Sequence, residues 1–314
     1  MLKKKVLIFG STGQIGKHLI RKLTKNEYKV ICQTRNSHKA VFLKTSGSIG
    51  YIDIVETNIF DENNLEKLVE DCQVCINLIG ILHEQKKINT FKNIHTLFPI
   101  KLAKICKKKN VQFINFSALG LEDAKDSKYA KSKTDGEKGI KEVYKYSVII
   151  KPSLVFSVSD SLTTKFLSLL NTLPIFPLYY KGLTKFTPIH ASDISDFIYQ
   201  IISKEIHSKS IEVIGPEVLT FRQIIEILLK CIDKKRLLIP LPLSIAKLSA
   251  SFLQILPNPP ITLDQLKLLK YDNIKSANGI TNFDLGFKSK IRFEEGVMKY
   301  AYNWRDGGQY SIRK

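Results

Sequence analysis

Short runs of apolar and β-branched residues alternate with longer amphipathic stretches over the first 152 residues. The apolar runs predict strands within VLIFG, YKVICQT, IDIVETN, VCINLIG, VQFINFSA and YSVIIKPS. Between them, apolar residues recur at intervals of three and four, which predicts helices over 14–25, 63–70, 90–107 and 127–143. Such alternation is typical of a parallel sheet covered by helices. We therefore expect an α/β fold with a Rossmann-type, doubly wound parallel sheet.

Beyond Pro152 this alternation fades, and proline clusters such as LPIFP, IPLPL and LPNPP interrupt the pattern. Helical patterns remain at 193–204, 220–231, 243–256 and 262–269. We expect a Rossmann domain over 1–152 and a smaller C-terminal α/β lobe over 153–314, interleaved with it. The polar, glycine-bearing tail at 303–314 is expected to be flexible unless a partner orders it.

Apolar residues at helical spacing in the second region leave two interpretations open. Leu243, Leu248, Phe252 and Leu256 recur at intervals that place several of them on one helix face. That face could pack toward the Rossmann core, or it could dock on a membrane protein or an apolar cleft.

A glycine-rich loop joins the first expected strand to the first expected helix. In its G-x-x-G-x-x-G pattern, the first glycine permits a tight turn, the second lets a pyrophosphate approach the backbone, and the third lets the helix pack on the strand. The helix N-terminus offers free N–H groups to phosphate. A plain βα turn is the alternative, but the flanking elements favour dinucleotide binding. The expected contacts from this loop are Gly10, Thr12, Gly13, Gln14, Ile15 and Gly16.

The end of the second strand indicates which dinucleotide is bound. NAD sites normally place a carboxylate about 20 residues after the glycines, on the ribose hydroxyls. Between Tyr28 and Ala40 there is no acidic residue, and Arg35 is present with Lys39 nearby. This favours NADP(H) over NAD(H), unless Arg35 is an ordinary surface cation. Further cofactor contacts are expected from residues within or just after the strand segments: Asn58, Ile59, Leu78, Gly80 and Pro152.

Tyr129 and Lys133 lie at positions i and i+4, on one face of an expected helix. A phenol can act as an acid or base when a neighbouring ammonium stabilises the phenolate, and the same ammonium can hold a nicotinamide ribose. The spacing is also common on solvated helix faces. We take Tyr129, Lys133 and the strand-end Ser117 as the candidate catalytic residues, with Lys133 also binding cofactor.

In this order, the glycine loop, Ser117 and the Tyr129/Lys133 pair resemble the extended short-chain dehydrogenase/reductase superfamily, in its NAD-dependent epimerase/dehydratase branch. Within it, the chain is most similar to the nucleotide-binding accessory subunits of respiratory complex I, NADH:ubiquinone oxidoreductase, over nearly its whole length. The segments that carry this similarity are NLIGIL, SALG, YAKSKTDGE, KPSLVF, TPIHASDIS, IGPEVLTFRQI, IPLPLSIAKL and DQLKLLKYDN. The resemblance implies a tightly held NADP(H) of largely structural role and a respiratory-chain membrane complex as partner.

Two departures from the superfamily pattern bear on activity. Ser117 is followed by Ala118 and Leu119, so a single hydroxyl replaces the usual Ser-rich run that polarises a substrate carbonyl. His95 stands where the superfamily usually has a structural Asn. We therefore expect a binding protein with a weakened active site. The alternatives are an active NADP-dependent reductase or epimerase, linked to ubiquinone metabolism, and an RNA-binding protein on this fold.

Composition limits the remaining classes. With 49 Lys and Arg against 29 Asp and Glu, the net charge is +20, but the lysines are dispersed and form no basic stripe with aromatics. Nucleic acid is therefore not the expected partner, whereas an anionic membrane surface is compatible. Cys72 and Cys75 have no accompanying ligands, so no metal is expected. No stretch reaches the roughly 18 apolar residues of a membrane span, and no transit peptide is seen. We expect a cytoplasmic protein, with peripheral attachment to the inner membrane as an option.

Overall fold

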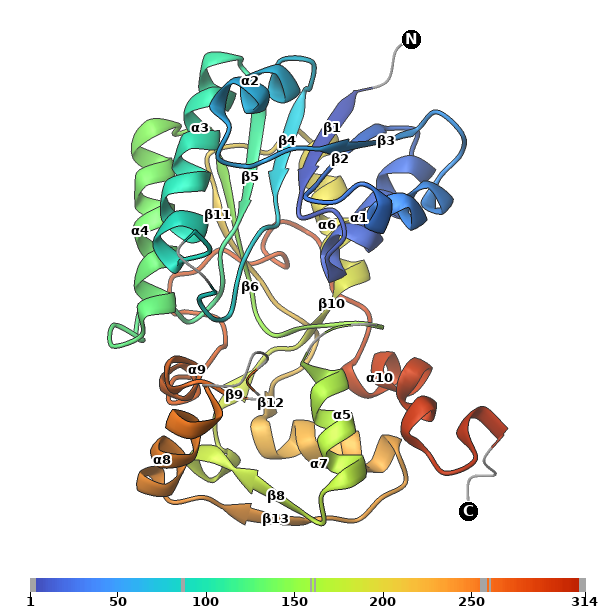
Figure 1. The fold of residues 1–314 in the computed structure, drawn as a ribbon, viewed down its shortest axis with the longest axis vertical. Coiled ribbons are helices and arrows are strands. Elements are labelled where there is room, and N and C mark those ends of the chain that lie inside the picture. The colour runs from blue at the N-terminus through green and yellow to red at the C-terminus, as the bar shows by residue number, and fades with distance from the viewer. Residues whose placement is uncertain are drawn as a thin grey trace.

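The computed structural model describes residues 4–85, 88–158, 160, 162–254, 259 and 261–310. Seven parallel strands form its central sheet, in the order β11-β6-β5-β4-β1-β2-β3 (Figure 1). Their bounds are Lys5–Phe9 (β1), Lys29–Thr34 (β2), Ile52–Glu56 (β3), Val74–Asn77 (β4), Gln112–Phe116 (β5), Val148–Pro152 (β6) and Ser210–Val213 (β11). The predicted α/β, Rossmann-type fold is confirmed.

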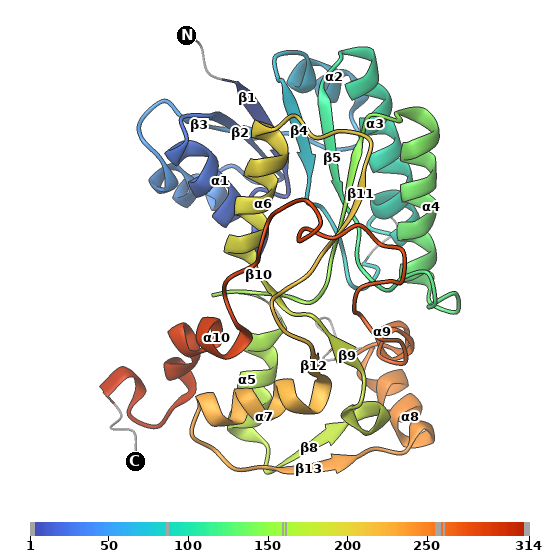
Figure 2. The same cartoon turned by 180° about the vertical axis from the view of Figure 1, so that it is seen from behind.

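Helices cover both faces of this sheet (Figures 1 and 2). On one face lie α1 (Gln14–Lys25) and α6 (Ala191–Ser203); on the other lie α2 (Glu62–Glu70), α3 (Phe98–Lys108) and α4 (Lys128–Val143). Both cores are apolar because strand side chains alternate between the faces. In β1, Val6 and Ile8 join the α1/α6 side, while Leu7 and Phe9 join the α2/α3/α4 side. This two-sided burial explains why the strands read as continuous apolar runs.

The third predicted helix, over 90–107, is interrupted. Residues Lys92–Leu97 form a π-helical segment before α3 begins at Phe98. Pro99 in the first turn of α3 lacks an N–H and cannot continue the hydrogen-bond ladder of a preceding α-helix. The π-helical segment carries His95 into the space beside α4, and such segments are often found at functional sites.

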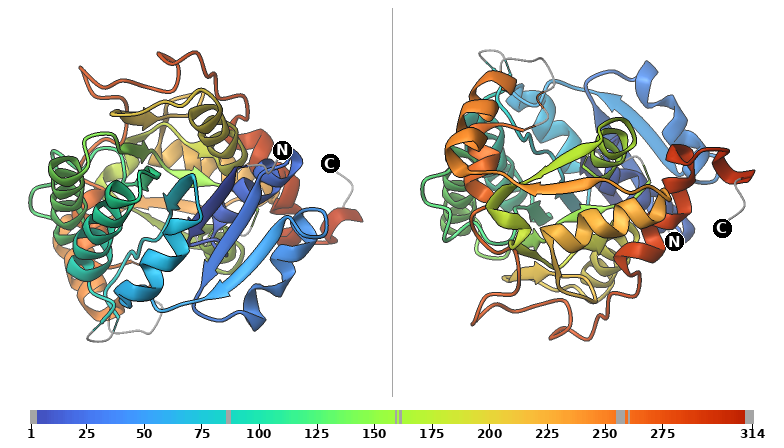
Figure 3. Two further views of the ribbon diagram at one scale, coloured as in Figure 1. Left: turned by 90° about the horizontal axis from the view of Figure 1, so that it is seen from above. Right: turned by 90° about the horizontal axis from the view of Figure 1, so that it is seen from below.

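The second layer lies beyond the carboxyl ends of the sheet strands (Figures 1 and 3). It contains three two-stranded pairings: β7 (Val155–Phe156) with β10 (Ile189–His190), β9 (Lys185–Phe186) with β12 (Leu219–Thr220), and β8 (Ile175–Leu178) with β13 (Leu237–Pro240). Its helices are α5 (Thr163–Thr172), α7 (Phe221–Cys231), α8 (Leu243–Leu253), α9 (Leu263–Leu268) and α10 (Phe293–Ala301). Short 3₁₀ segments occur at His38–Ser46, Tyr179–Gly182, Tyr302–Trp304 and Gly308–Tyr310. Because α6 and β11 belong to the sheet layer, the chain crosses between the layers more than once.

Helix α8 turns its large apolar side chains outward. Only Ala246 and Ala250 are buried in it, whereas Leu243, Leu248 and Phe252 are 43%, 61% and 66% exposed. For these three residues the interpretation of a face packed toward the Rossmann core is wrong, and Leu256 lies outside the described residues. None of the described helices has the length and apolar character needed to cross a membrane.

Candidate functional site

The glycine loop is held by close backbone packing. Gly10 has φ +79°, and a Cβ there would lie 3.1 Å from the carbonyl carbon of Leu78 after β4. A Cβ on Gly16 would lie 2.4 Å from the Ser11 carbonyl oxygen. Each of these positions therefore accepts glycine alone without rearrangement. The Ser11 hydroxyl donates to the Gln33 carbonyl at 2.9 Å, which ties the loop to β2.

The N-terminus of α1 has free backbone donors. Gly13 is its N-cap, no side chain caps it, and its first turn has no acidic residue. By contrast, Asp61 caps α2 and Ser127 caps α4. The buried Gln14 Nε2 also has no hydrogen-bond partner. Free N–H groups at a helix N-terminus suit a phosphate, so the loop fits the pyrophosphate of a dinucleotide. In NAD(P) enzymes, such a group supplies hydride transfer when bound.

At the expected adenosine end, the structure adds a carboxylate that the sequence analysis missed. Arg35 and Lys39 are exposed after β2, as expected. Glu56, at the end of β3, pairs with Thr34 across the sheet and accepts bonds from Ser37 N at 2.8 Å and Ser37 Oγ at 2.7 Å. These hydrogen bonds lower the pKa of Glu56. Examining the neighbouring strand end, in addition to β2, could have found it.

Two further predicted cofactor contacts follow β3. The side-chain oxygen of Asn58 accepts a bond from Phe60 N at 3.0 Å, within its own turn. Ile59 is 7% exposed and packs in the core on the α2/α3/α4 side. No described contact joins either side chain to Arg35, so their role as cofactor contacts stays a prediction.

The residues after β4 meet α4 and His95. A Cβ on Gly80 would lie 3.5 Å from Lys133 Nζ and 3.9 Å from His95 Nε2. Gly80 therefore lies in van der Waals reach of the lysine ammonium and the histidine ring. The structure thus brings together the predicted contacts Leu78, Gly80 and Lys133 at the carboxyl end of the sheet. Pro152 ends β6 nearby in the strand order, where its carbonyl accepts Leu119 N at 2.9 Å.

The pKa values of Lys133 and Tyr129 are both shifted in the direction that favours the neutral side chain. Lys133 is 6% exposed, donates to the Phe116 carbonyl at 3.0 Å, and has a pKa lowered to about 8 by burial, partly offset by Glu137. Burial raises the pKa of Tyr129 to about 12. Its ring packs edge-on against His95 and Phe91, with centroids 5.2 and 5.8 Å away. Both residues lie on α4, and the surroundings of Tyr129 do not favour a phenolate.

Ser117 is engaged elsewhere. Its hydroxyl donates to a Glu137 oxygen, and Glu137 in turn pairs with Lys151 at 3.0 Å. Ser117 and Glu137 are buried and Lys151 is half-buried, and the three groups link the end of β5, α4 and β6. No described contact joins Ser117 to Tyr129. The proton expected to polarise a substrate carbonyl is therefore committed to a structural carboxylate.

His95 is fixed in its neutral form. Ile81 N donates to His95 Nε2 at 3.0 Å, so the proton lies on Nδ1, which contacts Ser132 Oγ at 3.0 Å. Ser132 Oγ then donates to the Tyr129 carbonyl at 2.8 Å. Burial, with a smaller effect of Lys133, lowers the pKa of His95 to about 2. These contacts hold His95 against the first turns of α4.

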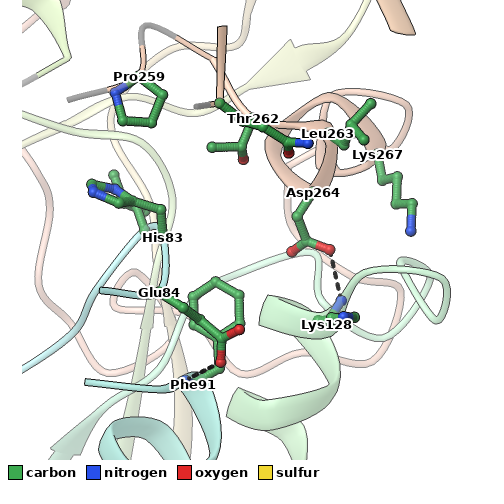
Figure 4. Close-up of a pocket in the computed structure, with 11 residues that line it drawn as sticks. His83, Glu84, Phe91, Lys128, Pro259, Thr262, Leu263, Asp264 and Lys267 are labelled. Atoms are coloured by element: carbon green, nitrogen blue, oxygen red, sulfur yellow. Dashed lines mark hydrogen bonds between the residues drawn. The ribbon is translucent and has the colours of Figure 1, made fainter. Parts of the chain in front are cut away.

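A pocket of about 430 Å³ opens beside this group, between the two layers (Figure 4). From the sheet layer come the loop after β4 and the first residue of α4; from the second layer come the segment after α8 and the start of α9. The residues labelled in Figure 4 are His83, Glu84, Phe91, Lys128, Pro259, Thr262, Leu263, Asp264 and Lys267. The sequence analysis did not include them, because they come together only through the fold.

Cys72 and Cys75, the C-x-x-C pair, lie in the sheet core. Cys72 and Cys75 are buried free thiols, and burial raises the pKa of Cys72 to about 12. Among the described residues there is no group of three or more His, Cys, Asp or Glu side chains arranged to hold a metal. A protonated thiol is a poor metal ligand, so the C-x-x-C spacing reflects two buried positions around the start of β4.

Two relatives are respiratory subunits. The chain is 25% identical over 309 residues to the NADH-ubiquinone oxidoreductase 40 kDa subunit of Neurospora crassa mitochondria, covering 97% of this chain and 80% of that protein. It is 26% identical over 315 residues to NADH dehydrogenase (ubiquinone) 1 alpha subcomplex subunit 9 of Arabidopsis thaliana mitochondria, covering 96% and 78%. The resemblance to complex I accessory subunits is confirmed.

The fold has solved counterparts. A dTDP-glucose 4,6-dehydratase from Bacillus anthracis, solved in complex with NAD, superposes with a TM-score of 0.68 at 14% identity, covering 96% of this chain and 98% of that one. This likeness confirms the Rossmann-type α/β fold. In sequence, residues 2–248 match the NmrA-like family. The chain therefore belongs to the NmrA-like family.

Proposed function

We propose that this chain binds NADP(H) as a largely structural cofactor and serves as an accessory subunit of a respiratory membrane complex. The observation that carries the proposal is the uncapped N-terminus of α1, which follows the Gly10–Gly16 loop at the sheet centre. There β1 lies between β2 and β4, where the strand order reverses and where ligands of doubly wound folds bind.

The preference for NADP(H) is supported by the charges at the adenosine end. Arg35 and Lys39 are exposed and available to a 2′-phosphate. Glu56 opposes such a phosphate, but both of its bonds to Ser37 hold it on the loop. The balance of two cations against one engaged carboxylate favours the phosphorylated cofactor.

A structural role is supported by the state of the candidate catalytic groups. The phenol of Tyr129 is neutral with a raised pKa, the Ser117 proton is donated to Glu137, and His95 acts as a brace. The second candidate function is an active NADP-dependent reductase or epimerase. The pocket beside Phe91 and Lys128, next to Tyr129, supports it as a place for a substrate. RNA binding has no such supporting feature.

The proposed partner and location are supported by the relatives and by α8. Both respiratory relatives belong to a membrane complex, and α8 presents apolar side chains outward at the far end of the second layer (Figure 1). We place the chain on the cytoplasmic side of an inner membrane, peripherally attached to that complex through this face. The five buried free thiols are compatible with a reducing compartment.

The test is cofactor-linked stability. A ligand bound only by the native state at 100 times its Kd adds about 2.7 kcal/mol to the free energy of unfolding. Wild-type protein should therefore melt several degrees higher with NADPH. Gly13→Val should abolish this rise, because a side chain at the α1 N-cap, whose Cβ lies 3.2 Å from the Gly10 carbonyl, blocks the phosphate.

The matched control is Gly286→Val. Gly286 has φ +75° with no atom within 4 Å of a Cβ, so the substitution strains a loop outside the cofactor site. It should lower the melting temperature yet keep the NADPH-induced rise. If Gly13→Val gained as many degrees with NADPH as the wild type, the phosphate-loop assignment would be wrong.

A further inference from the structure

A carboxylate from the second layer caps the helix that bears Tyr129 and Lys133. Asp264 Oδ2 accepts bonds from Ser127 Oγ at 2.7 Å and from Tyr129 N at 2.9 Å. Its Oδ1 accepts a bond from Lys128 N at 2.8 Å, which Figure 4 shows as a dashed line. About 135 residues separate the partners in sequence. A carboxylate on the N-terminal amides of a 16-residue helix is stabilised by the helix dipole and by charge-assisted bonds.

Asp264 is itself held rigidly. It lies in the first turn of α9, where Thr262 and Gln265 form a reciprocal capping box. One turn further, Lys267 Nζ donates to the Asp126 carbonyl at 2.8 Å. This is a second hydrogen bond between the second layer and the residues at the start of α4. The cap therefore joins two ordered elements.

The same segment, residues 261–273, also forms hydrogen bonds with the residues that follow β5 and β6. Asn273 Nδ2 donates to the Leu119 carbonyl after β5, and Ser153 Oγ after β6 donates to Asn273 Oδ1 at 2.6 Å. Gly120 approaches so closely that a Cβ would lie 2.8 Å from the Asp272 carbonyl oxygen. The segment thus spans the ends of β5 and β6 and the start of α4, which border the nicotinamide end of a Rossmann site.

We propose that Asp264 is a positioning residue, through which the second layer sets α4, and with it Lys133, for the nicotinamide half of the cofactor. The proposal rests on the dinucleotide binding proposed above. Because coupling between sites is reciprocal, nicotinamide binding also tightens the docking of residues 261–273. The adenosine half, which lies over β1, β2 and Arg35, does not depend on Asp264.

The experiment compares two ligands by calorimetry on the full chain. One is NADPH, and the other is 2′,5′-ADP, which carries the adenosine half alone. Asp264→Ala should weaken NADPH binding roughly tenfold and leave 2′,5′-ADP within about twofold of the wild type. Asp264→Asn keeps one acceptor oxygen and should fall between wild type and alanine. Hydrogen exchange at the Lys128 and Tyr129 amides should quicken in Asp264→Ala.

Asp272→Ala is the matched control. It removes a carboxylate from the same segment, one that accepts a bond from Lys185 N at 2.8 Å and has no described hydrogen bond to α4. Its NADPH affinity should equal that of the wild type. Unchanged NADPH affinity in Asp264→Ala, or equal weakening of both ligands, would overturn the positioning role. A wild-type chain that binds neither ligand would instead refute the proposed function itself, and the positioning role with it.

Discussion

Arg35 and Glu56 oppose each other at the adenosine end of the proposed site. The positive side chain follows β2 and the negative one ends β3, in register with Thr34. A 2′-phosphate gains from the first and is repelled by the second, whereas a free ribose hydroxyl gains from a carboxylate. The two residues should therefore shift cofactor preference in opposite directions.

Arg35→Ala should lower NADPH affinity by about 1.5–3 kcal/mol, roughly tenfold to a hundredfold, and leave NADH nearly unchanged. Glu56→Gln should raise the preference for NADPH over NADH. Calorimetric titration of both nucleotides measures the ratio, with Lys44→Ala, an exposed lysine of the 3₁₀ segment after β2, as control. Equal NADPH and NADH affinities in the wild type would exclude the NADP(H) assignment.

Burial of Lys133 lowers the stability of the fold, and we expect its ammonium to bind the cofactor. Its pKa is lowered from 10.5 to about 8, so the folded state disfavours the ammonium. The unfolded chain binds this proton more tightly, so the cost is fully present below pH 8 and disappears as the pH rises from about 8 to 10.5. A buried lysine that costs stability is expected where its charge serves a ligand.

Lys133→Met should raise the free energy of unfolding at pH 7 by about 1–2 kcal/mol. This net gain already subtracts the lost hydrogen bond to the Phe116 carbonyl. The same substitution should weaken NADPH binding. The stability gain should shrink at pH 9.5, which thermal melts at both pH values would show. The matched variant Tyr129→Phe should leave NADPH affinity within about twofold. In an enzyme, Tyr129→Phe would instead lower turnover roughly 10²–10⁴-fold with cofactor still bound, which would contradict a structural role.

At the scale of elements, what was predictable is what the local pattern encodes. All six expected strands occur, and α1 spans residues 14–25 as its apolar spacing predicts. The seventh strand, β11, was missed because it is only SIEV and contains the buried Glu212, whose carboxylate accepts bonds from Ser276. The two-residue strands of the second layer are likewise too short to leave a period.

The residues of the candidate site also fall into those that a local pattern reveals and those that only the fold brings together. The glycine loop and the Tyr129/Lys133 pair are local patterns, so their spacing, together with the flanking elements and the resemblance, could single them out as candidates. Glu56 and Asp264 act across strand neighbours or across the two layers, and no spacing along the chain encodes such contacts. Ser117 shows the converse: its position is evident from the strand end, but its partner Glu137 depends on how α4 packs.

At the scale of the whole molecule, the proposed cofactor site and the proposed docking face on α8 lie at opposite ends of the second layer. The carboxyl ends of the sheet strands face the second layer (Figure 1). The glycine loop, Lys133 and the pocket lie on this side of the sheet. Helix α8 lies at the outer end of that layer, on the side away from the sheet. Surface attachment through α8 would therefore leave the cofactor site intact, which allows the two to be tested separately.

The double substitution Leu248→Ser and Phe252→Ser should release the chain from its respiratory complex while preserving fold and NADPH binding. Both side chains are largely exposed, at 61% and 66%, so their loss opens no cavity in the chain itself. Comigration with NADH-oxidising complex on native gels of detergent-solubilised membranes measures attachment. Ile49→Ser, at a fully exposed apolar residue before β3, is the control and should remain attached. A double variant that comigrated like the wild type would exclude α8 as the docking face, and wild-type binding to protein-free anionic vesicles would identify lipid as its partner.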